Sequence, residues 1–187
     1  MDAHQKDKRM HNRGVWLLGL LLLGCWLIAD SNPAQAQERS GFTLQLDFGA
    51  GLIEPTFSNM PHFGFSAGLG VGGFVTENLA ILARANAVYI RWEEYEGRMA
   101  QFISVFFGVH AQYWICNSFF ISGGPGAVFV AYEEVDGSGS NFSWGISLRT
   151  GYSFLTTTHH SLQVTLEFTN IDVHALMANL SLAWQFF

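Results

Sequence analysis

The sequence predicts an all-β protein: an eight-stranded antiparallel up-and-down transmembrane β-barrel preceded by a helical signal peptide. Three observations predict it: one apolar run near the N-terminus, strict alternation of large apolar residues afterwards, and a second strand face that is small and polar. The 187 residues are 49% hydrophobic, 15% aromatic and 13% charged. Few charges and many aromatic residues exclude disorder, and one short apolar run excludes a bundle of membrane helices. A net charge of −6 argues against a nucleic-acid partner.

Residues 1–36 have the layout of a cleaved signal peptide. Lys6, Lys8, Arg9 and Arg13 precede an apolar run over 15–29, and Ala34-Gln35-Ala36 follows a polar break with a proline. A basic region, an apolar core of about fifteen residues and a small-residue site are the three parts of a secretory signal. We therefore expect cleavage after Ala36 and a single barrel domain over 37–187.

Two alternatives remain open for this segment. An uncleaved membrane anchor is disfavoured because the run is shorter than the roughly 20 residues that span a bilayer. Leu22-Leu23-Gly24-Cys25 loosely matches a lipidation site, but apolar residues continue beyond Cys25. After cleavage Cys116 would be the single cysteine, so no internal disulfide is expected.

Period-two alternation predicts the strands. It is strict over 42–48, 63–72, 142–153, 162–169 and 179–186, and weaker over the β-branched and aromatic segments 79–91, 99–114 and 119–132. Eight strands leave about nineteen residues for each strand and its connection, which suits membrane strands of roughly 9–11 residues.

The composition of the two faces favours a membrane barrel over a soluble sandwich. A soluble sandwich needs charges on its outer face, whereas here the second face is mostly Gly, Ser, Thr and Gln. Small polar residues suit the narrow interior of an eight-stranded barrel, and the large apolar face would then meet lipid. We expect longer links over 52–61, 92–98 and 133–141, short ones over 75–78 and 115–118, and a β-bulge at Pro125.

Together these features resemble the small outer-membrane β-barrels of Gram-negative bacteria, the OmpA/OmpX-like barrel domain family. The resemblance covers the whole chain after residue 36. It implies residence in the outer membrane, contact with its lipid, and recognition of the last strand by the barrel-assembly machinery. The expected assembly signal is Trp184, Phe186 and Phe187, in which the alternating register ends at Phe186 and leaves Phe187 as one extra aromatic.

Inward charges form the candidate site. The height of each residue is counted from the expected periplasmic end of its strand. By this count five residues share one layer of the lumen: Asp47, Arg84, His110, Arg149 and Glu167. Because charges in a dry lumen must be paired, we interpret the layer as a structural plug, and Arg149 is placed to pair with Glu167 across adjacent strands. The alternative is a gate that re-pairs to open a narrow ion path.

We expect no catalytic, cofactor or metal site. His159-His160-Ser161 with Glu167 resembles the site of lipid A deacylases, but lies in an expected periplasmic link. The acidic stretches 93–96 and 133–136 match no complete calcium loop. The predicted role is non-enzymatic: a monomeric surface protein of the cell outer membrane that serves envelope integrity or binds an unknown surface ligand. A narrow pore is the alternative, and a lipid-modifying enzyme a weaker one.

Overall fold

The computed structural model describes residues 39–55, 62–95, 98–134, 137–170 and 175–187. The expected signal peptide over 1–36, its cleavage after Ala36 and the alternative lipidation of Cys25 lie outside these residues. In the described part, no helix is long and apolar enough to cross a membrane.

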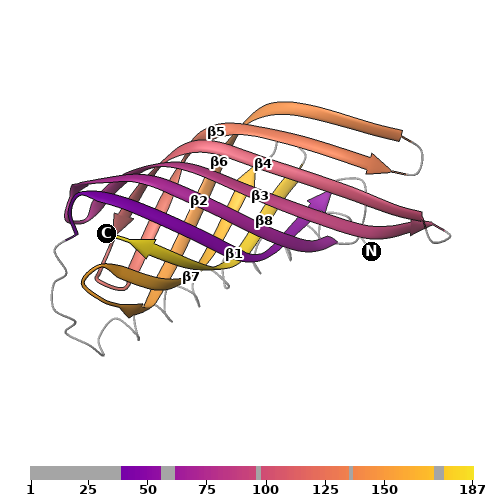
Figure 1. Ribbon diagram of the computed structural model, residues 1–187. Coiled ribbons are helices and arrows are strands. Elements are labelled where there is room, and N and C mark those ends of the chain that lie inside the picture. The colour runs from indigo at the N-terminus through magenta and orange to yellow at the C-terminus, as the bar shows by residue number, and fades with distance from the viewer. Residues whose placement is uncertain (1–38, 56–61, 96–97, 135–136, 171–174) are drawn as a thin grey trace, which may run out of the picture. The chain divides into compact units, whose positions relative to one another are not determined.

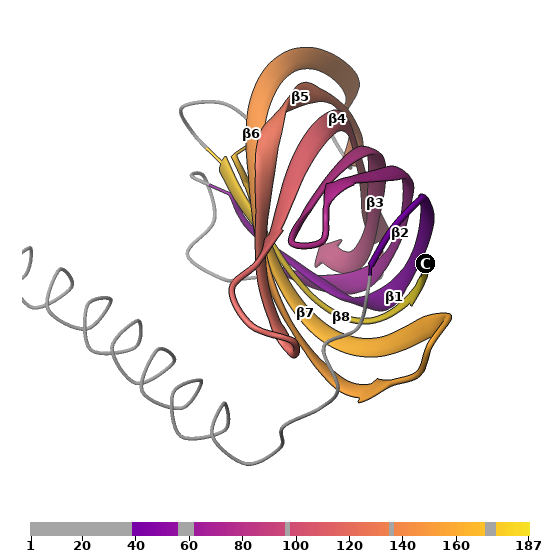
Figure 2. The same cartoon turned by 90° about the vertical axis from the view of Figure 1, so that its left-hand side faces the viewer.

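Eight antiparallel strands form a closed ring, as predicted (Figure 1). They are β1 (Phe42–Pro55), β2 (His62–Thr76), β3 (Leu79–Tyr95), β4 (Arg98–Trp114), β5 (Phe119–Glu134), β6 (Gly137–Thr156), β7 (His160–Asn170) and β8 (Ala175–Phe186). Each strand pairs with its neighbours in sequence, and β1 pairs with β8 to close the barrel (Figure 2). The start of β1 and the end of β8 share one end with the short turns, called here the turn end; the opposite end is the loop end.

The register sets the width of the barrel. Following the paired residues once around the ring from Phe42 leads back to β1 at Leu52, ten residues further along. Eight strands with this stagger tilt by roughly 40° and leave an interior that side chains just fill. The lumen is therefore a packed core.

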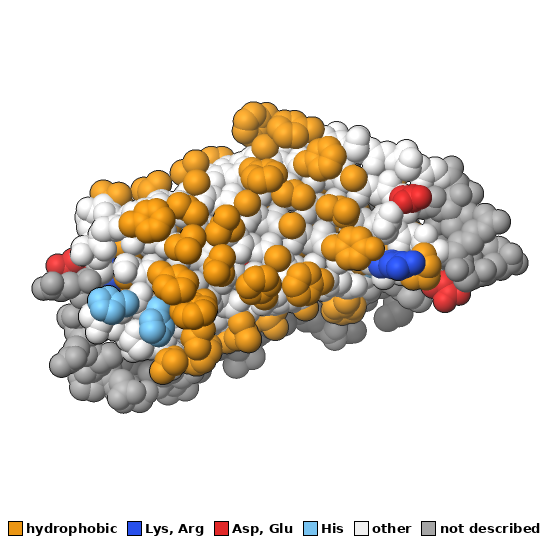
Figure 3. All heavy atoms as spheres, viewed as in Figure 1, with side chains coloured by type: hydrophobic (Ala, Val, Ile, Leu, Met, Phe, Trp, Pro, Cys, Tyr) orange, Lys and Arg blue, Asp and Glu red, His pale blue; other side chains and the backbone are white. Residues whose placement is uncertain are grey.

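Alternate residues face opposite sides of this wall. The outward face carries exposed aliphatic and aromatic side chains over its middle, and charged groups gather towards the two ends (Figure 3). Leu180 is 57% exposed and Leu148 61% exposed, while their chain neighbours Asn179 and Arg149 are buried. Large residues outside and polar residues inside are the reverse of the pattern in a soluble sandwich.

Aromatic residues lie towards both edges of this apolar belt. The register places Phe42, Tyr113, Phe154 and Trp184 near the turn end, and Phe63, Tyr89, Phe142 and Trp144 towards the loop end. Beyond the second group, a polar row crosses β3, β4 and β5 through the register partners Arg91, Gln101 and Glu133. Gln101 donates a hydrogen bond to Glu133 across this row. The row marks where the apolar belt ends.

Two of the expected long links are wrong. Strand β3 continues to Tyr95 and β4 begins at Arg98. Likewise β5 continues to Glu134 and β6 begins at Gly137. The segments 92–98 and 133–141 therefore belong mostly to two hairpins, which extend past the other strands at the loop end (Figure 1). Backbone pairing continues in water without the apolar alternation that was used to predict it, because the hairpin ladder satisfies itself.

The expected β-bulge at Pro125 is also wrong. Gly108 pairs with Gly126 and Ala111 with Gly123, so the register between β4 and β5 is the same on both sides of the proline. The ladder of β5 with β6 runs through Pro125 without a shift. Register shifts occur instead near strand ends, between Phe74 and Thr76, Glu93 and Tyr95, and Ser153 and Leu155.

The lumen is polar only in part. Its loop-end half holds the main buried apolar group, called here the loop-end cluster: Ile53, Val88, Ile90, Phe106, Val128 and Met177. Phe106 is fully buried and lies over two inward glycines, because a Cβ added at Gly108 or at Gly126 would stand 2.5 Å from its Cζ. The expectation of a small polar interior throughout is therefore wrong for this half.

These glycines allow a direct test of lumen packing. We expect Gly126→Ala to destabilise the barrel by about 1–3 kcal/mol, since the added methyl group overlaps the Phe106 ring and the Phe107 carbonyl. Gly70→Ala is the matched control: its Cβ would lie 3.4 Å from Gln45, an ordinary contact, and the substitution stiffens the unfolded chain. The measurement is urea unfolding of refolded protein in lipid vesicles. Equal midpoints for both variants would contradict the packing of Phe106.

Candidate functional site

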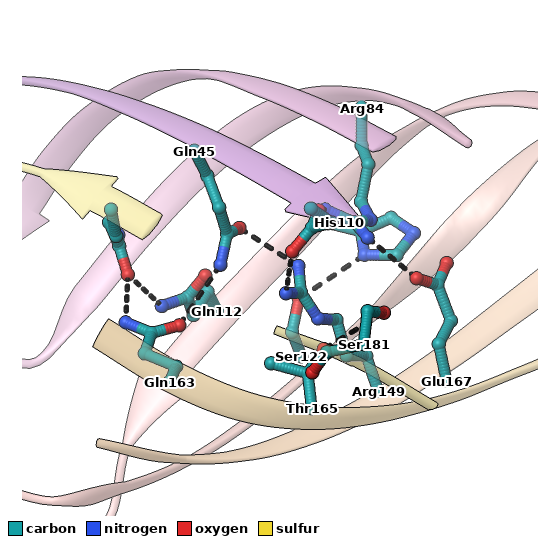
Figure 4. A network of polar contacts seen from close by, with 12 residues as sticks. Gln45, Arg84, His110, Gln112, Ser122, Arg149, Gln163, Thr165, Glu167 and Ser181 are labelled. Carbon is teal, nitrogen blue, oxygen red and sulfur yellow. Dashed lines mark hydrogen bonds and ion pairs between the residues drawn. The ribbon is translucent and has the colours of Figure 1, made fainter. Parts of the chain in front are cut away.

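The structure brings the five inward charged and imidazole residues to one level of the lumen. Asp47, Arg84, His110, Arg149 and Glu167 are each at most 3% exposed. Corrected for the stagger of the strands, the register places them within about two residues of one another along the barrel axis. They come from five different strands. Figure 4 shows Arg84, His110, Arg149 and Glu167 pointing towards the same central space.

Two arginines and two carboxylates form a continuous chain of ion pairs. Arg84 donates from Nη1 to Asp47 Oδ2 at 2.8 Å and from Nη2 to Glu167 Oε2 at 2.6 Å. Arg149 donates from Nη2 to the other oxygen of Asp47. Each carboxylate thus meets a guanidinium, and the four formal charges cancel.

The pairing differs from the predicted one. Arg149 and Glu167 are register partners on β6 and β7, but among the described residues their ion pairs lead to Asp47 and Arg84. Glu167 instead accepts a second hydrogen bond from Ser147 Oγ at 2.7 Å. In a ring this narrow, long side chains reach across the lumen, so adjacent strands do not decide which charges pair.

His110 lies beside the ion pairs. Its Nδ1 is 3.2 Å from Ser122 Oγ on the neighbouring strand, and its ring packs against the edge of Phe106 at a centroid distance of 5.6 Å. His110 therefore joins the charged layer to the loop-end cluster.

A belt of amides lies on the turn-end side of the charges, and sequence reasoning did not single it out. Arg149 Nη1 donates to Gln45 Oε1 at 2.9 Å, and Gln45 Nε2 donates to Gln163 at 3.1 Å. The chain continues from Gln163 to Gln185 at 2.8 Å, and Gln112 donates to the same Gln185 oxygen at 3.2 Å. Four inward glutamines at one strand height are the signal that could have predicted it.

A glycine on β2 makes room for the ion pairs. A Cβ at Gly68 would lie 2.9 Å from Asp47 Oδ2 and 3.4 Å from Arg84 Nη2, whereas one at Gly70 would make only ordinary contacts with Gln45 and Arg84. Because Gly68 carries no side chain, the Asp47 carboxylate and the Arg84 guanidinium can meet beside it. Gly68 therefore allows the network to form.

The network has the chemistry of a structural core. Its cationic and anionic groups are paired, and breaking one side of a buried pair is costly. In the described ranges, no three His, Cys, Asp or Glu side chains converge as they would around a metal ion. Part of the acidic stretches 93–96 and 133–136 lies outside those ranges.

The residues that resemble a hydrolase site do not assemble. Ser161 is fully buried in the lumen, where its Oγ accepts a hydrogen bond from Gln163 at 2.7 Å. His160 packs against Trp184 and Phe186, two residues of the opposite, outward face. Glu167 is held by Arg84 and Ser147. His159, the histidine of the His-x-Ser pair, is exposed in the turn before β7. The buried serine hydroxyl therefore bonds Gln163 rather than either histidine.

The three residues of the expected assembly signal do not share one position in the fold. Trp184 and Phe186 lie on the outward register of β8, and their rings stack at a centroid distance of 4.7 Å. Phe187 follows the strand: its N–H donates to the His159 carbonyl at 2.9 Å, and its ring lies 5.8 Å from Phe74. Phe186 is therefore the last residue of the outward row.

A double-substitution cycle tests the ion pairs. We expect Asp47→Asn to destabilise the barrel by about 3–5 kcal/mol, because both arginines then share one carboxylate. Adding Arg149→Gln restores neutrality, so the double variant should lose at least about 1 kcal/mol less than the sum of the two single losses. Exposed Glu133→Gln is the control and should change stability by less than about 0.5 kcal/mol. Strictly additive losses in urea unfolding would contradict the coupling.

Comparison with solved structures supports the fold. No protein-family model matches the sequence, and no curated protein matches it significantly. The structure superposes on Neisserial surface protein A (NspA) with a TM-score of 0.63 at 17% identity, covering 79% of this chain and 97% of that one. Ail, the attachment invasion locus protein of Yersinia pestis, solved with the heparin analogue sucrose octasulfate, gives 0.57 at 11% identity, covering 79% and 98%. OprG of Pseudomonas aeruginosa gives 0.50 at 12% identity, covering 80% and 98%. The chain therefore has the fold of the small eight-stranded outer-membrane β-barrels.

Proposed function

We propose that this chain is an integral protein of the Gram-negative outer membrane, exported through cleavage after Ala36 and inserted as a monomer. The observation that carries the proposal is the exposed apolar belt around a ring whose polar groups face inward. In hydrocarbon a sheet must close, because an open edge leaves backbone groups unsatisfied. By the resemblance to outer-membrane barrels, the turn end faces the periplasm and the loop end faces the outside.

We infer a non-enzymatic role in envelope integrity or surface interaction. The hairpins of β3 with β4 and of β5 with β6 extend past the polar row at Arg91, Gln101 and Glu133, so they offer backbone and side chains to the outside. Membrane lipid, the assembly machinery and an unidentified surface ligand are the partners that this role needs. The filled lumen argues against a narrow pore, and the burial of Ser161 in the lumen, while His159 is exposed in the turn, argues against a hydrolase.

A charge placed on the belt tests the membrane assignment. Leu180→Arg puts a cation near the middle of the apolar wall, where hydrocarbon should penalise it by about 2–4 kcal/mol. We therefore expect it to reduce or abolish the folded, heat-modifiable band in gels of outer-membrane fractions. The control is Ser138→Arg on the exposed end of β6, which should leave the band unchanged. A soluble barrel would tolerate Leu180→Arg, so an unchanged soluble periplasmic protein would refute the assignment.

Truncation tests the assembly signal. Because Phe186 ends the outward row with Trp184, deletion of Phe187 alone should leave assembly largely intact, whereas deletion of both Phe186 and Phe187 should strongly reduce folded barrel in the outer membrane. The measurement is the heat-modifiable fraction at equal expression. Normal assembly after the double deletion would mean that this terminus is not recognised.

A further inference from the structure

The polar middle of the lumen lies between an apolar layer and a layer of two aromatic rings covered by an arginine. Towards the loop end it meets the loop-end cluster, in which Val88, Ile90, Phe106, Val128 and Met177 are each at most 1% exposed. Towards the turn end it meets a second group, called here the turn-end cluster: Arg39, Trp114 and Phe120. The register pairs Trp114 with Phe120, and both are inward and at most 2% exposed.

Arg39 completes the turn-end cluster from outside the strands. Its guanidinium carbon lies 3.9 Å above the Trp114 ring, and its Nη2 donates to the Asn117 carbonyl at 2.7 Å. Arg39 is 2% exposed although it precedes β1. Burial lowers the pKa of its guanidinium to about 10, so it stays cationic at neutral pH and keeps its attraction to the indole face.

The layers between the two clusters differ from the clusters in how readily water can hydrate their side chains. The amide belt and ion pairs consist of groups that water can hydrate. Beside the charges, Ser66 Oγ, Thr169 Oγ1 and both side-chain polar atoms of Asn179 are buried without a hydrogen-bond partner. Polar groups of this kind are those that buried water satisfies. The two clusters offer water fewer such partners: Ser104 Oγ, beside Val88 in the loop-end half, and Arg39 Nε and Trp114 Nε1 in the turn-end cluster. Their other contacts are aliphatic side chains and aromatic rings, so the clusters oppose the passage of water more strongly than the charges do.

We propose that the lumen is closed by two seals in series, the loop-end cluster and the turn-end cluster, and that the charged layer between them is not the barrier to ions. Opening either seal alone leaves the other closed. A conducting path requires both to open, while loss of one charge in the middle leaves the path closed. The wild-type barrel is on this basis a sealed polar compartment.

Inward and outward residues of the same type supply the test. Phe106→Ser opens the loop-end seal and Trp114→Ser the turn-end seal; Phe107→Ser and Trp144→Ser remove the same ring types from outward positions that are 56% and 78% exposed. Each purified, refolded variant is assayed for single channels in planar bilayers after a heat-shift gel has verified folding. We expect discrete openings at least tenfold more frequent than in wild type only in the Phe106→Ser/Trp114→Ser double variant. Wild type, each single variant, Glu167→Gln and the outward double variant should stay silent.

The other outcomes overturn the proposal. Channels in one single variant would mean that the remaining cluster is no seal. Channels in Glu167→Gln, or silence from a folded double variant, would make the charged layer the barrier.

Thiol labelling tests each seal without the double variant, should that variant fail to fold. Cys116 is first replaced by serine so that it does not react. Asn179→Cys then measures reagent access on the inner side of the loop-end cluster, and Gln163→Cys measures it on the inner side of the turn-end cluster. Both native residues are at most 1% exposed. A membrane-impermeant thiol reagent should label Asn179→Cys at least tenfold faster after Phe106→Ser, and Gln163→Cys at least tenfold faster after Trp114→Ser. Phe107→Ser and Trp144→Ser should not change these rates. Equal rates with and without the inward substitution would refute the corresponding seal.

Discussion

Closure of the sheet through the pairing of β1 with β8 is the constraint on which the other features depend. With eight strands and a stagger of ten residues, the ring is too narrow for a water-filled channel and too wide to be filled by small side chains alone. Its interior must therefore hold some long side chains, each with room to extend. Gly68 on β2 provides that room for the pair of Arg84 with Asp47, and the glycines at 108 and 126 provide it for Phe106. The arrangement of glycines decides which level holds charges and which holds rings.

The parts of the fold that follow from local alternation could be predicted from the sequence. Large outward residues beside small or polar inward ones occur along β1, β2, β6, β7 and β8, and turn residues bound the β-branched and aromatic segments between them, so the number of strands follows from the sequence. The layer containing Asp47, Arg84 and Glu167 follows from the same counting, because strand height is a linear function of residue number. Counting residues along the strands does not show how far each side chain extends across the lumen. Arg149 and Glu167 are adjacent in register, but each pairs with a residue further around the ring, since two long side chains that point inward, such as Arg84 and Glu167, together span the lumen.

The errors have a common physical origin. Alternation of apolar and polar residues indicates where the apolar belt ends, not where the strand ends. The hairpins continue past the belt, where both faces of the strand meet water. The predicted strand ends near Trp92 and Glu133 are therefore too early. The loop-end cluster was missed for the converse reason. Where both faces of β3, β4 and β5 carry apolar residues, such as Phe106 inside and Phe107 outside, alternation disappears from the sequence although the strand persists. Pro125 was expected to need a bulge, but the register passes it unchanged on both sides.

Placing apolar layers at both ends of a charged middle also has an energetic consequence. An ion pair attracts more strongly as water is excluded, but each ion then loses its hydration, so the pairs are favourable only when the four groups satisfy one another. Asp47 uses both carboxylate oxygens and Arg84 both terminal nitrogens, which is the arrangement that exclusion of water demands. The apolar layers and the ion pairs thus require each other: opening a layer weakens the pairs by hydration, and breaking a pair leaves a charge that only water could stabilise. The barrel interior is one cooperative unit, even though its chemistry changes from aromatic to amide to charged to aliphatic along its axis.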